Sequence, residues 1–432
     1  MRTIFSNKNY TVFLTTSWVY STFNYMSSYF NLYLRSLGWD VLLIGVVLSI
    51  SAGFSGIFRL IGGYMGDVVD RKKISFFAYL TLALYFLAIG IFFEFWVVIA
   101  AILAISIHDL FRSGSSAYLM DNVPKEHSGF ALSLFTAGRG LSIISLIVFG
   151  FIEPMIGFSE AFRAMYIMTG FCVLVASGAR AYFLDSSVQL QKRTDRGLIS
   201  EFFSQNRKAA VLLITAIPGL ISVVVLDTIS DSLFKTVALI YANEELSIDI
   251  AGINLILMFQ LLISVPLLLK MGRITDRKGV KKAAIVVYSV MPISAALLFF
   301  APLFPYMIPA GFVLAFDTYA PGLSVIFSTA FVGIVMKYLN DALWWGLIVI
   351  LIRKRLPQTD TAKVLSIFWV IVYILSSVGP AIAGFIYTFL NPQSTFLTVF
   401  VLNILILISV AKGPFGNNNS EQQQEIEPQE QD

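Results

Sequence analysis

The sequence is poor in charged residues and in the residue types that build metal sites and disulfides. Of its 432 residues only 13% are charged, against about 25% in soluble globular proteins. The single cysteine, Cys172, excludes an internal disulfide and a cysteine metal cluster, and the two histidines, His108 and His127, are too far apart in sequence to suggest a zinc site. No basic face interleaved with aromatic residues suggests nucleic acid. We therefore expect no metal, no cofactor and no nucleic-acid partner.

Apolar residues are correspondingly abundant. They make up 57% of the chain, against about 45–50% in soluble proteins. Many runs reach the roughly 20 residues that an α-helix needs to cross the hydrocarbon core of a bilayer. The first such run is too long for a cleavable signal peptide, and no small-residue cleavage site follows it. We therefore expect an integral membrane protein that is embedded in the lipid bilayer.

The apolar segments form two sets of six, separated by a polar linker. The first set covers residues 10–33, 41–65, 74–93, 95–120, 130–152 and 161–184. The second set covers residues 210–242, 250–271, 283–299, 325–352, 362–390 and 395–411. This pattern predicts an all-α membrane protein with twelve transmembrane helices in two six-helix bundles, residues 1–184 and 209–412, joined by a linker at 185–208. The tail, 413–432, ends in the polar and acidic GNNNSEQQQEIEPQEQD, which predicts disorder.

Lysine and arginine are concentrated in alternate loops. These basic loops include residues 71–73, 125, 192–208, 273–282 and 353–355. The intervening loops are mostly acidic, with Glu94, Glu153, Glu160, Glu244, Glu245 and Asp249. The positive-inside rule places the basic loops, the linker and both termini in the cytoplasm of a multi-pass cell-membrane protein. The apolar segment 301–324 has no place in this count, so we expect an external hairpin, a re-entrant piece or a broken helix there.

Two charged stretches are copies of one loop. GGYMGDVVDRKK, residues 62–73, and GRITDRKGVKK, residues 272–282, each lie between the second and third segments of their set. Asp67 and Asp276 are 209 positions apart, and the same offset relates the lysine pairs that end both stretches. This shared register indicates an internal duplication with parallel topology.

The second copy resembles the signature loop of the major facilitator superfamily, Gly-x-x-x-Asp-Arg/Lys-x-Gly-x-Lys/Arg-Lys/Arg. The matching residues are Gly272, Asp276, Arg277, Gly279, Lys281 and Lys282, and in the first copy Gly63, Asp67, Arg71, Lys72 and Lys73. The first copy departs at Val68, where a basic residue is usual, and at Asp70, where glycine is usual. The resemblance implies a cytoplasmic clasp, in which the motif aspartate faces a neighbouring helix end and nearby arginines. Such a clasp biases an equilibrium between two states without touching the substrate.

Charged residues inside membrane spans are costly and mark transport pathways by default. Two clusters occur in the fourth and tenth segments: His108, Asp109 and Arg112, and Lys337, Asn340 and Asp341. When the prolines that end these segments, Pro124 and Pro357, are aligned, His108 falls on Asp341. We expect Asp109, Arg112 and Asp341 to form the core of a substrate and coupling site between the halves. Alternatively, each cluster is a neutralised pair on its own helix, at i,i+3 or i,i+4 spacing.

Other polar residues extend this candidate site. Ser17, Ser21, Asn24, Ser28 and Asn31 recur on one helical face, where Asn24 and Asn31 favour a cavity lining over simple close packing. In the seventh segment, Asp227, Asp231 and Lys235 follow at i, i+4 and i+8, either as site residues or as interfacial charges near the external end. Arg139 in the fifth segment could counter Asp109 or Asp227, or bind an anionic substrate.

These features favour a secondary transporter that moves a small organic solute by alternating access, acts as a monomer and has no catalytic residues. The sequence holds no Gly-x-x-x-x-Gly-Lys-Ser/Thr loop, so solute or ion gradients must supply the energy. Asp109, Asp227 and Asp341 could each carry a proton, because burial favours a neutral carboxyl group. Charges of both signs, asparagines and aromatics suit a zwitterionic or amphipathic solute. The alternative is a transporter-like receptor or lipid-handling membrane protein that moves no soluble substrate.

Overall fold

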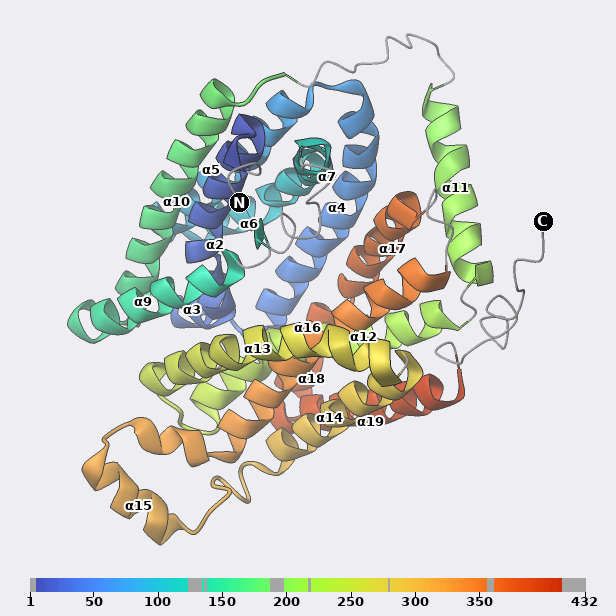
Figure 1. The fold of residues 1–432 in the computed structure, drawn as a ribbon. Coiled ribbons are helices and arrows are strands. Elements are labelled where there is room, and N and C mark those ends of the chain that lie inside the picture. Colours follow the sequence, from blue (N-terminus) through green and yellow to red (C-terminus); the bar gives the residue numbers. More distant parts are fainter. Residues whose placement is uncertain are drawn as a thin grey trace.

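The structure is a computed structural model that describes residues 5–122, 134–135, 138–186, 198–216, 219–278, 280–355 and 361–413. In these ranges the chain is helical, apart from short connections and one isolated β-bridge. Figure 1 shows the helices in two groups, one from the first half of the chain and one from the second. The first half is here residues 5–186, and the second half is residues 198–413.

Side-chain caps fix the starts of α2, α4 and α5 in the first half. This half contains α2 (Lys8–Asn24), η1 (Tyr25–Tyr29), α3 (Phe30–Ser36), α4 (Val41–Val68), α5 (Arg71–Ile91), α6 (Phe95–Ala104), α7 (Ser106–Asn122), η3 (Gly138–Leu141), α9 (Ser142–Ile156) and α10 (Phe158–Phe183), where η marks a 3₁₀ turn. Asp40 Oδ1 accepts from the backbone N–H of Leu43 at 2.7 Å before α4. Asp70 Oδ1 accepts from the N–H of Lys72 at 3.0 Å before α5. Asp70, where the signature loop usually has glycine, therefore serves as a helix cap.

The second half has the same general order of helices, with an additional short helix. It contains α11 (Leu198–Ala216), α12 (Leu220–Glu244), α13 (Ile250–Lys278), α14 (Val280–Phe300), α15 (Ala310–Tyr319), η4 (Leu323–Phe327), α16 (Thr329–Arg355), α17 (Thr361–Ser376), α18 (Gly379–Phe389) and α19 (Pro392–Lys412). In Figure 1, α11 stands at the edge of this group, and it packs against α17.

Eight helical stretches in the described ranges are long and apolar enough to cross a membrane, and a ninth span arises if α11 and α12 are counted as one. Each of the twelve predicted segments overlaps one helix or consecutive helices, in the predicted order. The first predicted span is divided by η1 into pieces of 17 and 7 residues, each too short to cross alone. The predicted class, an all-helical membrane protein, is confirmed.

The predicted span 95–120 is broken at Ile105, beside α4. The Ser51 hydroxyl of α4 donates to the carbonyl oxygen of Ile102 at 2.7 Å, and the Ser106 hydroxyl donates to that of Ser51 at 2.9 Å. A side chain that engages a carbonyl of the helical ladder is a recognised cause of kinks. These serines therefore account for the boundary between α6 and α7.

The eleventh predicted span is broken at Pro380. Proline has no N–H, and its ring clashes with the carbonyl group four residues earlier, which here belongs to Ser376. Accordingly α17 ends at Ser376, and its freed carbonyl oxygen accepts from the Ser232 hydroxyl of α12 at 3.1 Å. The break thus ties α17 to α12.

The prediction of a single helix over residues 210–242 is wrong. Two helices, α11 and α12, meet there at an angle of 99°. Gly219 has a φ angle of 79°, a left-handed conformation that glycine adopts readily, and Pro218 lies outside the described residues. In addition, α11 begins at Leu198, so a helix occupies the second part of the stretch that the sequence predicted as linker, 185–208.

The apolar segment 301–324 forms a hairpin with its own short helix. The N–H of Met307 donates to the carbonyl oxygen of Phe327 at 2.9 Å, and that of Thr329 donates to Pro305 at 2.9 Å, which closes the base of the hairpin. Figure 1 shows α15 projecting from one end of the second half, away from the other labelled helices. Of the three alternatives expected for this segment, an external hairpin, a re-entrant piece or a broken helix, the hairpin fits this geometry.

The two halves approach most closely along α4. This helix packs against α17 and α18. A β-carbon at Gly45 would lie 2.2 Å from the carbonyl oxygen of Pro380, and one at Gly384 would lie 2.6 Å from that of Val41. Only glycine fits at these two positions, because any larger residue would force the backbones apart.

Polar bridges join the halves near the end opposite the basic loops. Arg35 Nε lies 2.6 Å from Glu244 Oε1, at the last turns of α3 and α12. Deeper in the molecule, the Tyr29 hydroxyl donates to Asn254 Oδ1 at 2.7 Å, and Asn254 Nδ2 donates to the carbonyl oxygen of Leu146 at 3.0 Å. These bonds connect α3, η1 and α9 of the first half to α12 and α13 of the second.

Candidate functional site

Four charged side chains on two helices of the second half form one cluster. Asp231 and Lys235 lie on α12, and Lys337 and Asp341 lie on α16. The i,i+4 spacing places each pair on one face of its helix. Lys235 Nζ lies 2.7 Å from Asp231 Oδ2 and 3.3 Å from Asp341 Oδ2. Lys337 Nζ lies 2.9 Å from Asp231 Oδ1 and also contacts Asp341. Every charge in the cluster therefore has an opposite neighbour on each helix.

The exposure of the side chains increases across the cluster, from a buried side to an open side. Exposure of the side chain is 2% for Lys337 and 8% for Asp341, but 15% for Asp231 and 43% for Lys235. Lys337 also lies 5.3 Å from the centre of the Phe234 ring. A charge this deep is tolerated only when it is paired, because its desolvation is unfavourable. Lys337 therefore holds the two aspartates together, and Lys235 closes the open side.

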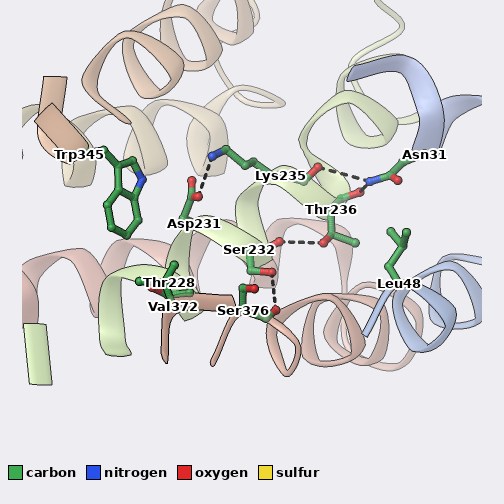
Figure 2. Close-up of a pocket in the computed structure, with 10 residues that line it drawn as sticks. All are labelled: Asn31, Leu48, Thr228, Asp231, Ser232, Lys235, Thr236, Trp345, Val372 and Ser376. Atoms are coloured by element: carbon green, nitrogen blue, oxygen red, sulfur yellow. Dashed lines mark hydrogen bonds and ion pairs between the residues drawn. The ribbon is translucent and has the colours of Figure 1, made fainter. Parts of the chain in front are cut away.

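A pocket of about 280 Å³ adjoins the open side of the cluster. Its lining residues are Asn31, Leu48, Thr228, Asp231, Ser232, Lys235, Thr236, Trp345, Val372 and Ser376. Figure 2 shows Lys235 reaching back to Asp231, with Trp345 on one side and Leu48 and Asn31 on the other. Asn31 Nδ2 donates to the carbonyl oxygen of Thr236 at 2.9 Å. Because Asn31 and Leu48 belong to the first half, both halves line the pocket.

Asp227 does not line this pocket. It is 2% exposed and faces the interior of the second half. The Tyr288 hydroxyl lies 2.9 Å from its Oδ1 and Trp344 Nε1 lies 2.9 Å from its Oδ2. Asn403 Oδ1 lies 3.0 Å from the same Tyr288 hydroxyl. Asp227 therefore lies in a helical core, which does not fit the alternative of an interfacial charge, and Asp231 belongs to the cluster.

A second charged group lies in the first half, beside α17. Arg59 NH2 of α4 lies 2.7 Å from Asp109 Oδ1 of α7, whereas Arg112 NH1 is 3.9 Å away. The Arg59 guanidinium also lies 3.7 Å from the centre of the Tyr373 ring of α17. The neutralised pair expected within α7 is therefore minor compared with the pair between α4 and α7. This group is here named the Arg59 contact.

The structure does not join Asp109 and Arg112 to Asp341 as one core. In the described ranges, the charged partners of Asp109 are Arg59 and Arg112, whereas those of Asp341 are Lys235 and Lys337. Each aspartate instead pairs with a cation on a neighbouring helix of its own half. The expectation that the three residues form one substrate and coupling core stays a prediction.

Comparison with known proteins identifies the family. The sequence model of the Major Facilitator Superfamily matches residues 12–316, more than half of the chain. The chain belongs to the major facilitator superfamily. It is therefore a multi-pass membrane transporter by family and not an enzyme. No curated protein sequence matches this chain.

Solved structures of the superfamily share the fold. The nucleoside transporter NupG is 13% identical, with a TM-score of 0.65 over 94% of this chain and 98% of that one. A POT family transporter in complex with 5-aminolevulinic acid is 12% identical, with a TM-score of 0.66 over 92% and 94%. A D-xylose-proton symporter is 16% identical, with a TM-score of 0.64 over 94% and 97%. At these identities the likeness shows the fold alone.

The superfamily signature loops are described only in part. Gly279 lies outside the described residues, and only the backbone is described at Asp67, Gly272, Asp276 and Arg277. Residues 272–277 continue α13 as helix. A β-carbon at Gly63 would be 3.8 Å from the Phe202 ring of α11, and Arg71 is the first residue of α5. The clasp therefore stays a prediction.

The remaining predicted residues lie apart from the pocket. His108 Nδ1 is 2.8 Å from the carbonyl oxygen of Ala78, which turns the ring toward α5. Asn24 Oδ1 accepts from the Tyr20 hydroxyl at 2.6 Å within α2. Asn340 is buried next to Asp341, and Arg139 is exposed on η3. Arg139 is not among the described partners of Asp109 or Asp227 named above, so the expectation that it counters either one is not supported.

Two arginines were not predicted from the sequence as residues with structural or functional partners. Arg59 lies in the apolar run SGIFRLIGG, and Arg180 lies in VASGARAYF near the end of α10. Arg180 is fully buried and donates to the hydroxyls of Thr16, at 2.9 Å, and Ser17, at 2.8 Å. Each is a lone arginine within a membrane span, and this feature could have indicated a buried partner or a function, because arginine is rare in spans without one.

Proposed function

We propose that this chain is a secondary transporter that moves a small organic solute by alternating access through the pocket between its halves. The observation that carries the proposal is that Asn31 and Leu48 of the first half line the same pocket as Asp231 and Lys235 of the second. A site between two halves is exposed to alternate sides when the halves rock against each other. A charged, paired cluster at that site supplies polar groups that a solute can meet without entering lipid.

The proposal includes an orientation. The positive-inside rule supports placing the basic loops, the linker and both termini in the cytoplasm of the cell membrane. The Arg35–Glu244 bridge then closes the external end in this conformation. Because the halves must part there in the opposite state, a covalent bond at this position should stop the cycle.

A cross-linking experiment in vesicles tests transport without knowledge of the substrate. We would replace Cys172 by Ala, introduce Arg35→Cys and Glu244→Cys, and join the two thiols with a short bismaleimide. Proteoliposomes with and without the cross-link would receive a mixture of small metabolites and a pH gradient. Mass spectrometry of the lumen should find at least one solute enriched only without the cross-link.

Matched controls make this result specific. Each single-cysteine variant, treated with the same reagent, should transport like the untreated protein. If no solute accumulates above the cross-linked level, the transporter proposal is wrong, and a receptor or lipid-handling role takes its place.

Proton coupling is part of the same proposal. Asp231 and Asp341 share Lys337, so protonation of one carboxylate would release that lysine to the other. Asp341→Asn should therefore abolish accumulation driven by a pH gradient and spare counterflow exchange of the enriched solute. Equal loss of both activities would contradict a coupling role for Asp341.

A further inference from the structure

We infer that the solute of this pocket is a small zwitterion, whose ammonium group meets Asp231 and whose carboxylate meets Lys235. The inference rests on the proposed function and deepens it by naming a substrate class. It starts from the two charges that line the pocket, one of each sign, on adjacent turns of α12. Lys337 and Asp341 are not among the lining residues and lie behind them.

Asp231 and Lys235 can exchange each other for a solute, because both line the pocket, whereas Lys337 and Asp341 do not line it. Lys235 has 43% of its side chain exposed, and its flexible stem can swing Nζ away from both Asp231 and Asp341. When it does so, Asp231 keeps the ammonium of Lys337 at 2.9 Å. The inner group of Asp231, Asp341 and Lys337 then holds two negative charges and one positive charge. It attracts a cation, while Lys235 attracts an anion.

Charge balance selects a solute that carries both signs. An amine alone would satisfy the inner group and leave Lys235 without its partner, and a carboxylate alone would leave the inner group with excess negative charge. An unpaired charge in a largely buried site is strongly unfavourable. A zwitterion that inserts between Lys235 and the two aspartates replaces the two internal ion pairs of Lys235 by two ion pairs with the solute. It is therefore the class whose entry leaves every charge paired.

Size and lining limit the rest of the solute. A volume of about 280 Å³ suits a metabolite smaller than the usual drug-sized ligand. Trp345, Leu48 and Val372 offer apolar surface beside the charged pair, and Thr228 and Ser232 add hydroxyls. Figure 2 shows Trp345 on the side of the pocket opposite Leu48, with Asp231 between them. The apolar residues favour a zwitterion with a hydrocarbon or aromatic side chain.

Thermal-shift measurements on the purified full chain test this class directly. Three skeletons would be compared at equal concentration, each as zwitterion, amine and acid: phenylalanine with 2-phenylethylamine and 3-phenylpropanoate, leucine with 3-methylbutylamine and 4-methylpentanoate, and 4-aminobutanoate with butylamine and butanoate. Because a ligand stabilises the state that it binds, the zwitterion of at least one skeleton should raise the Tm more than both of its relatives. If the amine or the acid does as well in every skeleton, or if no zwitterion raises the Tm, the inference is overturned.

A change of specificity guards against a variant that merely fails to fold. Lys235→Gln removes the outer positive charge, so the amine should gain about tenfold in affinity and the zwitterion should lose about tenfold. Lys8→Met, a lysine change far from the pocket at the exposed Lys8–Asp185 pair, should leave both affinities unchanged. A Lys235→Gln protein that keeps its preference for the zwitterion would overturn the assignment of Lys235.

The two proposals can fail separately. Thermal shifts need no transport, so a protein that binds zwitterions in this way but enriches nothing in vesicles would overturn the transporter proposal alone. A protein that enriches only singly charged solutes in vesicles would overturn the inference of a zwitterionic solute and leave the transporter proposal standing.

Discussion

In each half a buried charged side chain contacts a tyrosine, and the two tyrosines occupy equivalent positions of the repeat. The charged residue is Arg180 in the first half and Asp227 in the second, so the two charges have opposite signs. Tyr79 and Tyr288 are 209 positions apart, the offset of the repeat. The guanidinium carbon of Arg180 lies 3.4 Å from the centre of the Tyr79 ring. In the second half, the Tyr288 hydroxyl donates to Asp227 at 2.9 Å. One tyrosine presents its ring to a cation, and the other presents its hydroxyl to a carboxylate.

The neighbours of each ion fit its sign. Arg180, a donor at every polar atom, is surrounded by acceptors: the hydroxyls of Thr16, Ser17, Ser75 and Ser115, and the carbonyl oxygen of Phe13. Asp227, which only accepts when ionised, faces two donors, Tyr288 and Trp344. In each half, therefore, the hydrogen-bonding groups around the buried ion match its sign.

The two ions also differ in their relation to the pocket. The partners of Arg180 come from α2, α5 and α7, all within the first half, and none of these residues lines the pocket. Asp227 lies one helical turn before Asp231 on α12, so it borders the charged cluster. We therefore expect Arg180 to act on the stability of the first half alone, and Asp227 to act on the pocket as well.

The largest effect is expected where a charge is shared. Lys337→Met leaves Asp231 and Asp341 with only Lys235, so stability should fall by about 3–5 kcal/mol, the range for removing one partner of a buried pair. Thermal unfolding in detergent, followed by tryptophan fluorescence, measures this loss. Adding Asp341→Asn to Lys337→Met removes one excess charge and should recover part of it. If the double variant is no more stable than the single one, the two residues are not coupled.

Arg180→Met should have the next largest effect, about 2–3 kcal/mol, since it removes several hydrogen bonds to one charged group. Its hydroxyl partners are not left without bonds, because Ser17 and Thr16 also donate to carbonyl oxygens of their own helix. The loss should therefore be smaller than that of Lys337→Met in the same thermal unfolding assay. The thermal shift caused by the zwitterion should be unchanged, and a weaker shift would contradict the separation of Arg180 from the pocket.

Asp227→Asn should have a smaller effect on stability than Arg180→Met, and it tests whether only the second-half ion influences the pocket. Asparagine can still accept from Tyr288, but its amide group would face the N–H of Trp344, so about 1–2 kcal/mol should be lost with one hydrogen bond. Asp227→Asn should also change the Tm shift produced by the zwitterion, unlike Arg180→Met. An unchanged ligand shift would show that the border with Asp231 has no functional consequence.

Much of the fold followed from the sequence because apolar length and loop charge are direct consequences of a bilayer. The segments around Val41–Val68 and Arg71–Ile91 were placed within a few residues. The breaks within the predicted spans were harder to predict, because they are caused by contacts between segments that are distant in the sequence. The boundary at Ile105 depends on Ser51, and the sequence around Ile105 contains no proline or glycine to announce it. By contrast, the Pro–Gly pair at 218–219 was a visible signal that the segment 210–242 is bent.

The residues of the charged cluster beside the pocket were singled out from the sequence, but their arrangement was not predicted. Asp231, Lys337 and Asp341 were singled out because charges in spans are rare, and these three do lie together. Spacing within one helix could not show that Lys337 reaches α12, or that Asp109 prefers Arg59 of α4 to Arg112 of its own helix. Which helices are neighbours decides these pairs, and the repeat alone did not supply that information.

The smallest expected effect concerns the Arg59 contact, where the two halves meet through a charge and a ring. Tyr373→Leu removes the ring over Arg59 together with the hydroxyl that interacts with Arg112, and keeps the Arg59–Asp109 pair. The loss of the ring contact alone should weaken the attraction between the halves by about 0.5–1 kcal/mol. If the halves rock, that loss should change the ratio of their two arrangements about two- to fivefold. Spin labels at Lys73→Cys and Lys412→Cys, exposed positions at the basic ends of α5 and α19, report the separation in a Cys172→Ala background.

The direction of that change follows from where the contact lies. Arg59 and Tyr373 touch across α4 and α17, nearer the basic end than Gly45 and Pro380, so losing the contact should favour a longer distance between the two labels. Tyr319→Leu, at a ring that is 89% exposed on α15, is the matched control and should leave the distances unaltered. A distribution that is identical in Tyr373→Leu and in the control would mean that the Arg59 contact does not hold the halves. The pairing of Arg59 with Asp109 would then serve only the packing of α4 on α7.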